Sequence, residues 1–236
     1  MLAGIAVSIV LVAGWQFSPL TATRKLVAVT LAAMLVAAFL DLRTLSWKSL
    51  WPILAGAAVA CGIWLVWPVL KRREGLDLLL LLAVAGAYPA WITASLDSLH
   101  GRTDQALGAL LALGMGTGVG AMLGASALLG QLGLAAAAAV GAGALVHFIG
   151  VRQHAGRVWT LPVSLSLGLL GASAVVYAKL PREALLLLAL VPLAAHIPLP
   201  GRTPDWLRLA LITIFCLVPA GAAIVFTWRV AGGIPL

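Results

Sequence analysis

Apolar residues fill almost the whole chain in long blocks, separated by short breaks at charged residues, prolines and glycines. A helix needs roughly 20 apolar residues to cross a hydrocarbon core of about 30 Å. Cutting the chain at its breaks predicts nine transmembrane helices, or eight if the short eighth block is re-entrant. The blocks cover approximately 2–20, 25–40, 50–70, 76–95, 105–129, 131–150, 161–179, 184–199 and 206–229. We therefore expect an all-α, polytopic helical membrane bundle that forms a single transmembrane domain over residues 1–236.

Two features of the chain suggest how this domain is organised. The first block lacks a basic leading region and a small-residue cleavage site, so residues 1–21 are expected to remain as an extra N-terminal helix. The stretches FLDLRTLSWK and FIGVRQHAGR then share a phenylalanine and two basic positions at a constant offset. This coincidence predicts a tandem repeat of two four-helix units, 22–130 and 131–236, in the same orientation.

Composition supports the membrane assignment and narrows the partners. The chain is 63% hydrophobic and 9% charged, and its mean hydropathy is +1.11. The net charge of +8 comes from Lys and Arg residues scattered over the ends of the blocks, a pattern typical of loops at lipid headgroups rather than of nucleic-acid binding. Cys61 and Cys216 lie inside apolar blocks with no paired spacing, so we expect neither a disulfide, nor a metal site, nor a cofactor.

Small residues mark the fifth and sixth blocks as the expected packing centre. In the fifth block Ala112, Gly116, Gly120 and Gly124 recur every four residues, which lets helix backbones approach closely. The sixth block, around AAAAAVGAGAL, is almost as rich in small residues. Kinks are expected at three prolines inside blocks: Pro89, Pro192 and Pro219.

Ionisable residues are almost absent from the middle of the blocks, which argues against a proton-coupled transporter with a carboxylate relay. The polar side chains expected to be buried include His147, His196, Tyr88, Tyr177 and Ser126. Each histidine is interpreted as a hydrogen-bonded residue near a helix end. A serine nucleophile at Ser126 is not favoured, because a mid-helix serine would not reach a base at His147, near the end of the next helix.

Two aspartates at block boundaries offer more chemistry. Asp41 ends the second block, and Asp104 begins the fifth, two crossings later. Because an even number of crossings returns the chain to the same face, both carboxylates are expected at one membrane surface. Asp77 is one crossing from Asp41 and is expected at the opposite surface. Two neighbouring aspartates share a proton and can activate water for peptide hydrolysis, without a metal.

The surroundings of these aspartates resemble the two catalytic regions of type IV prepilin peptidases. AAFLDLRTLSWKSLWPILAG, residues 37–56, is similar to the first region, and GRTDQALGALLALGMGTGVG, residues 101–120, is similar to the Gly-x-Gly-Asp region. The resemblance covers roughly residues 25–150. It implies that Asp41 and Asp104 form a catalytic dyad, that Gly101 contributes to substrate binding, and that the substrate is a pilin-like peptide.

Departures from the family pattern keep other functions open. Thr103 stands where the second glycine is usual, and Ala106 replaces a customary lysine. We therefore consider two alternatives to an aspartyl peptidase acting at the cytoplasmic face of the inner (plasma) membrane. One is a non-catalytic membrane subunit or scaffold with membrane-protein partners, and the other is a small-solute transporter built from the tandem repeat. All three are multi-pass proteins with the lipid bilayer as a partner.

Overall fold

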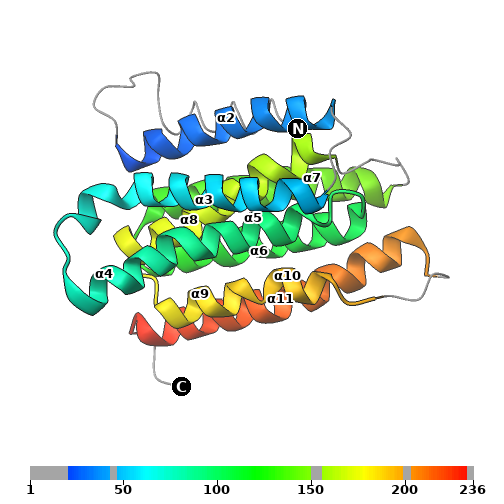
Figure 1. The fold of residues 1–236 in the computed structure, drawn as a ribbon. Coiled ribbons are helices and arrows are strands. Elements are labelled where there is room, and N and C mark those ends of the chain that lie inside the picture. Colours follow the sequence, from blue (N-terminus) through cyan, green and yellow to red (C-terminus); the bar gives the residue numbers. More distant parts are fainter. Residues whose placement is uncertain (1–20, 43–46, 150–155, 199–202, 233–236) are drawn as a thin grey trace.

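A computed structural model of the chain describes residues 21–42, 47–149, 156–198 and 203–232, which are helical apart from short connections (Figure 1). The elements are α2 (Ala22–Asp41), α3 (Trp47–Leu70), α4 (Gly75–Leu82), the π-helix η1 (Ala83–Ala87), α5 (Tyr88–Asp97), α6 (Thr103–Leu123), α7 (Ala127–Phe148), α8 (Arg157–Tyr177), α9 (Arg182–Ala189), α10 (Val191–Ala195) and α11 (Asp205–Val230).

Seven helices in the described part of the chain are long and apolar enough to cross a membrane. They are α2, α3, the continuous α4–η1–α5, α6, α7, α8 and α11. This confirms a multi-pass, all-helical membrane bundle. The predicted span 2–20 lies outside the described residues, and the predicted span 184–199 corresponds to two shorter helices, α9 and α10. The predicted total of nine is therefore not established.

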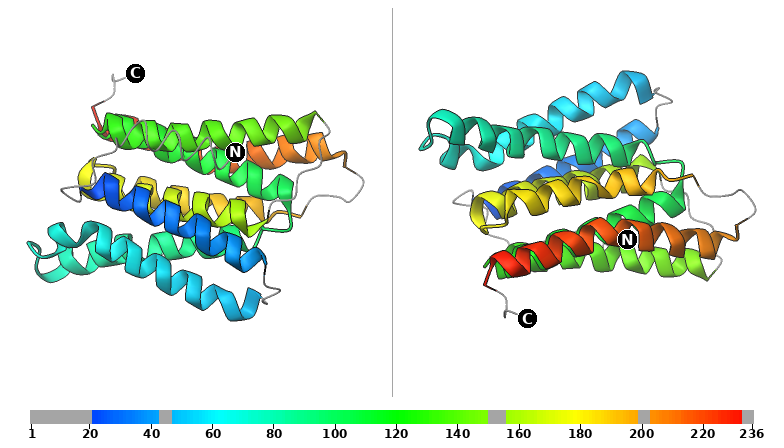
Figure 2. Two further views of the ribbon diagram at one scale, coloured as in Figure 1. Left: turned by 90° about the horizontal axis from the view of Figure 1, so that it is seen from above. Right: turned by 90° about the horizontal axis from the view of Figure 1, so that it is seen from below.

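The centre of the bundle is formed by α6 and α8 (Figure 2). α6 packs against α7 and α11, and α8 packs against α2 and α5. Glycines allow the expected close approach of α6 and α7, because a Cβ added at Gly114 would lie 3.0 Å from the Ala137 side chain. The small residues of the fifth and sixth blocks predicted that α6 and α7 form the packed centre together. In the structure α8 is far more enclosed than α7, since 83% of the residues in its apolar membrane-spanning stretch are buried, against 44% for α7.

Two of the three predicted kink sites show irregular helix. Pro89 has no backbone N–H to donate to the carbonyl of Ala85, and the π-helix η1 ends at Ala87, two residues before it. That carbonyl oxygen lies against Gly62 of α3, where a Cβ would overlap it. Near Pro192 the helix is interrupted at Leu190, between α9 and α10, and the indole N–H of Trp91 donates to the Ala189 carbonyl at 2.9 Å. Pro219, in contrast, lies inside a continuous α11.

The order of the elements agrees with the predicted repeat, whereas their packing is not equivalent. In chain order, α2, α3, α4–α5 and α6 correspond to α7, α8, α9–α10 and α11. However, α8 packs closely against α2 and α5, while among the described helices its counterpart α3 has no comparable contact with α7 or α9–α10. The repeat stays a prediction, and so does the transporter, which depends on two equivalent halves.

Candidate functional site

Charged side chains gather at the end of the bundle where α2 and α5 end and α6 and α8 begin. Asp41 and Asp104 both lie at this end, as the parity of crossings predicts. Asp77 lies at the opposite end, where Arg73 and Arg182 approach its carboxylate at 3.8 Å and 3.6 Å. We call the end that carries Asp41 and Asp104 the polar end.

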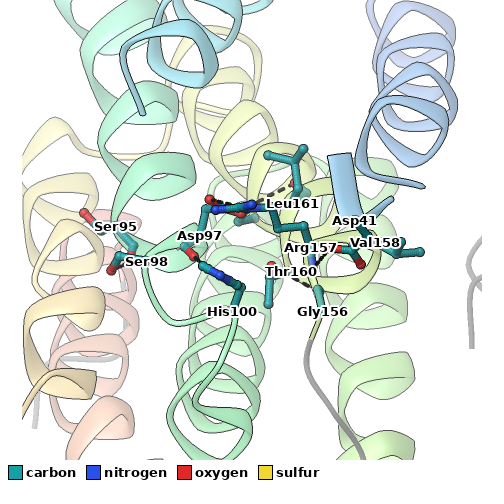
Figure 3. Close-up of polar contacts among 11 residues, drawn as sticks. Asp41, Ser95, Asp97, Ser98, His100, Gly156, Arg157, Val158, Thr160 and Leu161 are labelled. Carbon is teal, nitrogen blue, oxygen red and sulfur yellow. Dashed lines mark hydrogen bonds and ion pairs between the residues drawn. The ribbon is translucent and has the colours of Figure 1, made fainter. Parts of the chain in front are cut away.

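Asp41 closes the N-terminus of α8 (Figure 3). Its Oδ1 accepts a hydrogen bond from the backbone N–H of Arg157 at 3.0 Å, and its Oδ2 accepts one from Val158 at 3.1 Å. The first N–H groups of a helix have no partner within the helix, and its N-terminus carries a partial positive charge that attracts anions. Gly156, at the N-cap position, has no side chain to satisfy them. A carboxylate from another helix therefore replaces the missing cap.

The side chain of Arg157 joins α8 to α5. Its Nε lies 3.4 Å from Oδ2 of Asp97, whose side chain is fully buried. Each charge is unfavourably placed on its own helix, because Arg157 starts α8 and Asp97 ends α5. The ion pair between the two side chains offsets the unfavourable interaction of each charge with the dipole of its own helix. Nδ1 of His100 lies 2.6 Å from the Asp97 carbonyl oxygen, which can only accept a hydrogen bond, so this nitrogen carries a proton.

Asp104 belongs to a second group of polar side chains, which joins α6, α7 and α11. Its Oδ1 lies 2.7 Å from Nε2 of His147, in the last turn of α7. Its Oδ2 lies 3.8 Å from Nη1 of Arg208, in the first turn of α11. Both His147 and Asp104 are largely buried. An aspartate in the first turn of α6 also has a favourable interaction with the helix dipole.

The hydrogen bonds and ion pairs among the described residues do not join Asp41 to Asp104. Each of their four carboxylate oxygens contacts another group: backbone N–H groups for Asp41, and His147 and Arg208 for Asp104. Gly101 lies in the turn before α6, with no atom within 4 Å of the position that a Cβ would take. The structure thus brings the predicted residues to one end and gives the two aspartates separate partners.

Several residues of the polar end were not predicted from the sequence. Asp97 is separated from Asp41 by the same two crossings as Asp104, so the parity argument applies to it equally. Ser98 was not predicted either; it meets His196, which was expected to be hydrogen-bonded near a helix end, although the two residues are 98 positions apart. Ser126, the serine considered from the sequence, instead caps α7 by accepting a hydrogen bond from Leu129 N–H.

Searches of family models, curated proteins and solved structures find no match to this chain. Within the residues that the structure describes, no group of three or more His, Cys, Asp or Glu side chains is arranged to hold a metal ion. The fold and the polar end define a multi-pass helical membrane protein whose charged residues tie helix ends together.

Proposed function

We propose that this chain is a membrane subunit or scaffold of the plasma membrane, in which Asp41 and Asp104 have structural functions. One observation supports this proposal above others: all four oxygens of the two carboxylates contact groups on neighbouring helices. A catalytic dyad needs two carboxyl groups that share a proton and hold a water between them. Carboxylates that are engaged elsewhere are poorly prepared for that chemistry.

The contacts of both aspartates suit a protein that must keep its shape within a larger assembly. Asp41 connects α2 to α8, and Asp104 connects α6 to α7 and α11. In a bilayer the hydrophobic effect does not hold helices together, so polar contacts and close backbone packing carry more of the stability. Charge-assisted hydrogen bonds at helix ends supply such contacts. Other membrane proteins would bind along the lipid-facing sides of the bundle.

An aspartyl peptidase related to type IV prepilin peptidases is the second candidate. It is favoured by the position of Asp41 and Asp104 at the same end of the bundle, two crossings apart. In this alternative the two carboxylates would cleave a pilin-like leader at the cytoplasmic face. Catalysis would require Asp41 to leave the N-terminus of α8, so the active form would differ from the one described.

Asp→Asn variants distinguish the two candidates. The full chain and its Asp41→Asn and Asp104→Asn variants are incubated with a prepilin, with Asp77→Asn as a control at the opposite end. The scaffold predicts no cleavage by any of the four proteins, together with co-purification of a stoichiometric membrane partner from native membranes. Cleavage by the unmodified chain that falls by about 10²-fold or more in both test variants, and not in Asp77→Asn, would establish the peptidase instead.

A further inference from the structure

Ser98 and His196 form a hydrogen-bonded pair at the polar end. Ser98 follows the last residue of α5, and His196 follows the last residue of α10. The Ser98 Oγ lies 3.0 Å from Nε2 of His196, and Nδ1 of His196 lies 2.7 Å from the Pro192 carbonyl oxygen. Because that carbonyl can only accept, Nδ1 carries the proton of the neutral ring, and Nε2 presents its lone pair to Ser98.

This arrangement has the geometry of an activated nucleophile. A serine hydroxyl lies within hydrogen-bonding reach of a base, and a third group fixes the tautomer and orientation of that base. The Ser98 hydroxyl also lies 2.6 Å from the Ser95 carbonyl oxygen. Its single hydrogen can therefore turn between a resting position on Ser95 and a position on His196. In Figure 3, Ser95 and Ser98 lie on the opposite side of Asp97 from Arg157, apart from the ion pair.

The pair lines an open groove on the outside of the bundle, between α3 and α10, with a volume of about 760 Å³. Ala87, Ala90 and Ala94 belong to the lining on the α5 side, and Trp51 and Leu193 contribute from α3 and α10. The Trp51 side chain is about half exposed. Apart from Ser95, Ser98 and His196, the residues that line the groove have apolar or indole side chains.

We propose that Ser98 and His196 are the nucleophile and general base of a site that cleaves a carboxylic ester of a membrane lipid. The Ser98 Oγ attacks the ester carbonyl carbon while its proton moves to Nε2 of His196. The carbon–oxygen bond to the lipid alcohol then breaks, and His196 returns the proton to the leaving oxygen. Water then attacks the acyl-serine while its proton moves to Nε2 of His196. The bond between the acyl carbon and the Ser98 Oγ breaks, His196 returns the proton to Oγ, and a fatty acid leaves.

The lining favours a lipid over a peptide. An acyl chain has no polar groups to satisfy, so it can occupy the stretch between Trp51 and the three alanines without loss of hydrogen bonds. An extended peptide would place backbone N–H and C=O groups against the same apolar walls, where each group without a hydrogen-bond partner is strongly unfavourable. The hydrogen bonds of Ser98 and His196 go to each other, to Ser95 and to Pro192, and not to Asp41 or Asp104, so this site is independent of the proposed scaffold.

The test uses the full chain in phospholipid nanodiscs. A fluorophosphonate probe with a long alkyl chain reports the reactive serine, and a fluorogenic phosphatidylcholine ester reports turnover. Ser98→Ala removes the nucleophile, and His196→Ala removes the base. Ser126→Ala is the matched control, since this serine also sits at a helix boundary but caps α7 rather than contacting a histidine. Size-exclusion profiles and thermal unfolding establish that each variant is folded.

We expect probe labelling and ester hydrolysis to fall at least tenfold in Ser98→Ala and His196→Ala, and to be unchanged in Ser126→Ala. Ser98→Cys keeps a nucleophile beside His196 and should react with iodoacetamide faster than Cys61 or Cys216. Equal labelling of the folded Ser98→Ala variant, or no labelling of the folded unmodified chain, would overturn the site. Cleavage of peptide esters but not of lipid esters would overturn the substrate class.

Discussion

Asp41, the last residue of α2, accepts a hydrogen bond from the backbone N–H of Arg157, the first residue of α8, across 116 positions of sequence. On its own helix this carboxylate is at the unfavourable end, because the C-terminus of a helix carries a partial negative charge. At the N-terminus of α8 the same charge becomes favourable. This contact gives a structural reason, with no need for catalysis, for an acidic residue at the end of a largely apolar helix.

Loss of this cap should destabilise the bundle. Asp41→Ala removes both acceptors and is expected to lower the free energy of unfolding by about 1–2 kcal/mol, and Asp41→Asn by less, since the amide keeps one oxygen. The measurement is denaturant unfolding in detergent micelles. Asp77→Asn, which loses only exposed ion pairs, should change stability by less than about 1 kcal/mol. Equal effects of Asp41→Ala and Asp77→Asn would contradict the capping function.

The buried pair of Arg157 and Asp97 should behave as a coupled unit. Arg157→Met leaves the Asp97 carboxylate buried without its cation, and we expect a loss of about 3–5 kcal/mol. The double variant Arg157→Met/Asp97→Leu should be more stable than Arg157→Met alone, because no uncompensated charge remains. A double-mutant cycle on unfolding free energies measures this coupling. Additive effects of the two substitutions would show that the pair is not coupled.

Two glycines of α3 should respond in opposite ways to the same substitution. A methyl group at Gly62 would overlap the carbonyl oxygen of Ala85 in η1, whereas a methyl group at Gly56 meets no atom within 4 Å. Gly62→Ala should therefore destabilise the protein by about 1–3 kcal/mol through overpacking. Gly56→Ala should be neutral or stabilise it by up to about 1 kcal/mol, because alanine is the better helix former. Thermal unfolding of both variants checks this, and a Gly62→Ala protein as stable as Gly56→Ala would argue against the close approach of α3 to η1.

A similar comparison tests the close approach of Asp41 to the start of α8. A Cβ at Gly156 would lie 2.6 Å from the Asp41 Oδ2, while one at Gly101 meets open space. Gly156→Ala should push the carboxylate away and lose much of the cap, about 1 kcal/mol. Gly101→Ala should leave unfolding unchanged, and it also tests the predicted substrate-binding function of Gly101 if prepilin cleavage is observed. The measurement is denaturant unfolding of both variants. If Gly156→Ala is as stable as Gly101→Ala, the proposed contact between Asp41 and the start of α8 is wrong.

Hydrophobic blocks and the parity of crossings predicted the helices and the end of the bundle at which each aspartate lies. Spacing could not predict which side chains meet at that end. Asp97 contacts Arg157 because α5 packs on α8, and Ser98 contacts His196 because α10 lies beside the end of α5. These are long-range contacts, set by how helices are arranged around one another, and the apolar blocks carry little information about neighbours.

The break between α9 and α10 shows a second limit of the sequence. Pro192 predicts a kink from the sequence. The group that hydrogen-bonds to the Ala189 carbonyl at the end of α9, the Trp91 indole, lies on another helix and is not indicated by the sequence. The hydrogen bond from Trp91 to the Ala189 carbonyl attaches the α9–α10 connection to α5, and α5 forms one wall of the groove that Ser98 lines.

The hydrogen bonds from α8 to Asp41 also constrain the order of biogenesis. Asp41 is synthesised long before Arg157 and Val158, the residues whose backbone binds it. A nascent chain that contains only the first half of the protein therefore exposes an unmatched negative charge at the end of α2. Docking of α2 can be completed only after translation has passed residue 158, so the earliest described helix waits for a partner made much later.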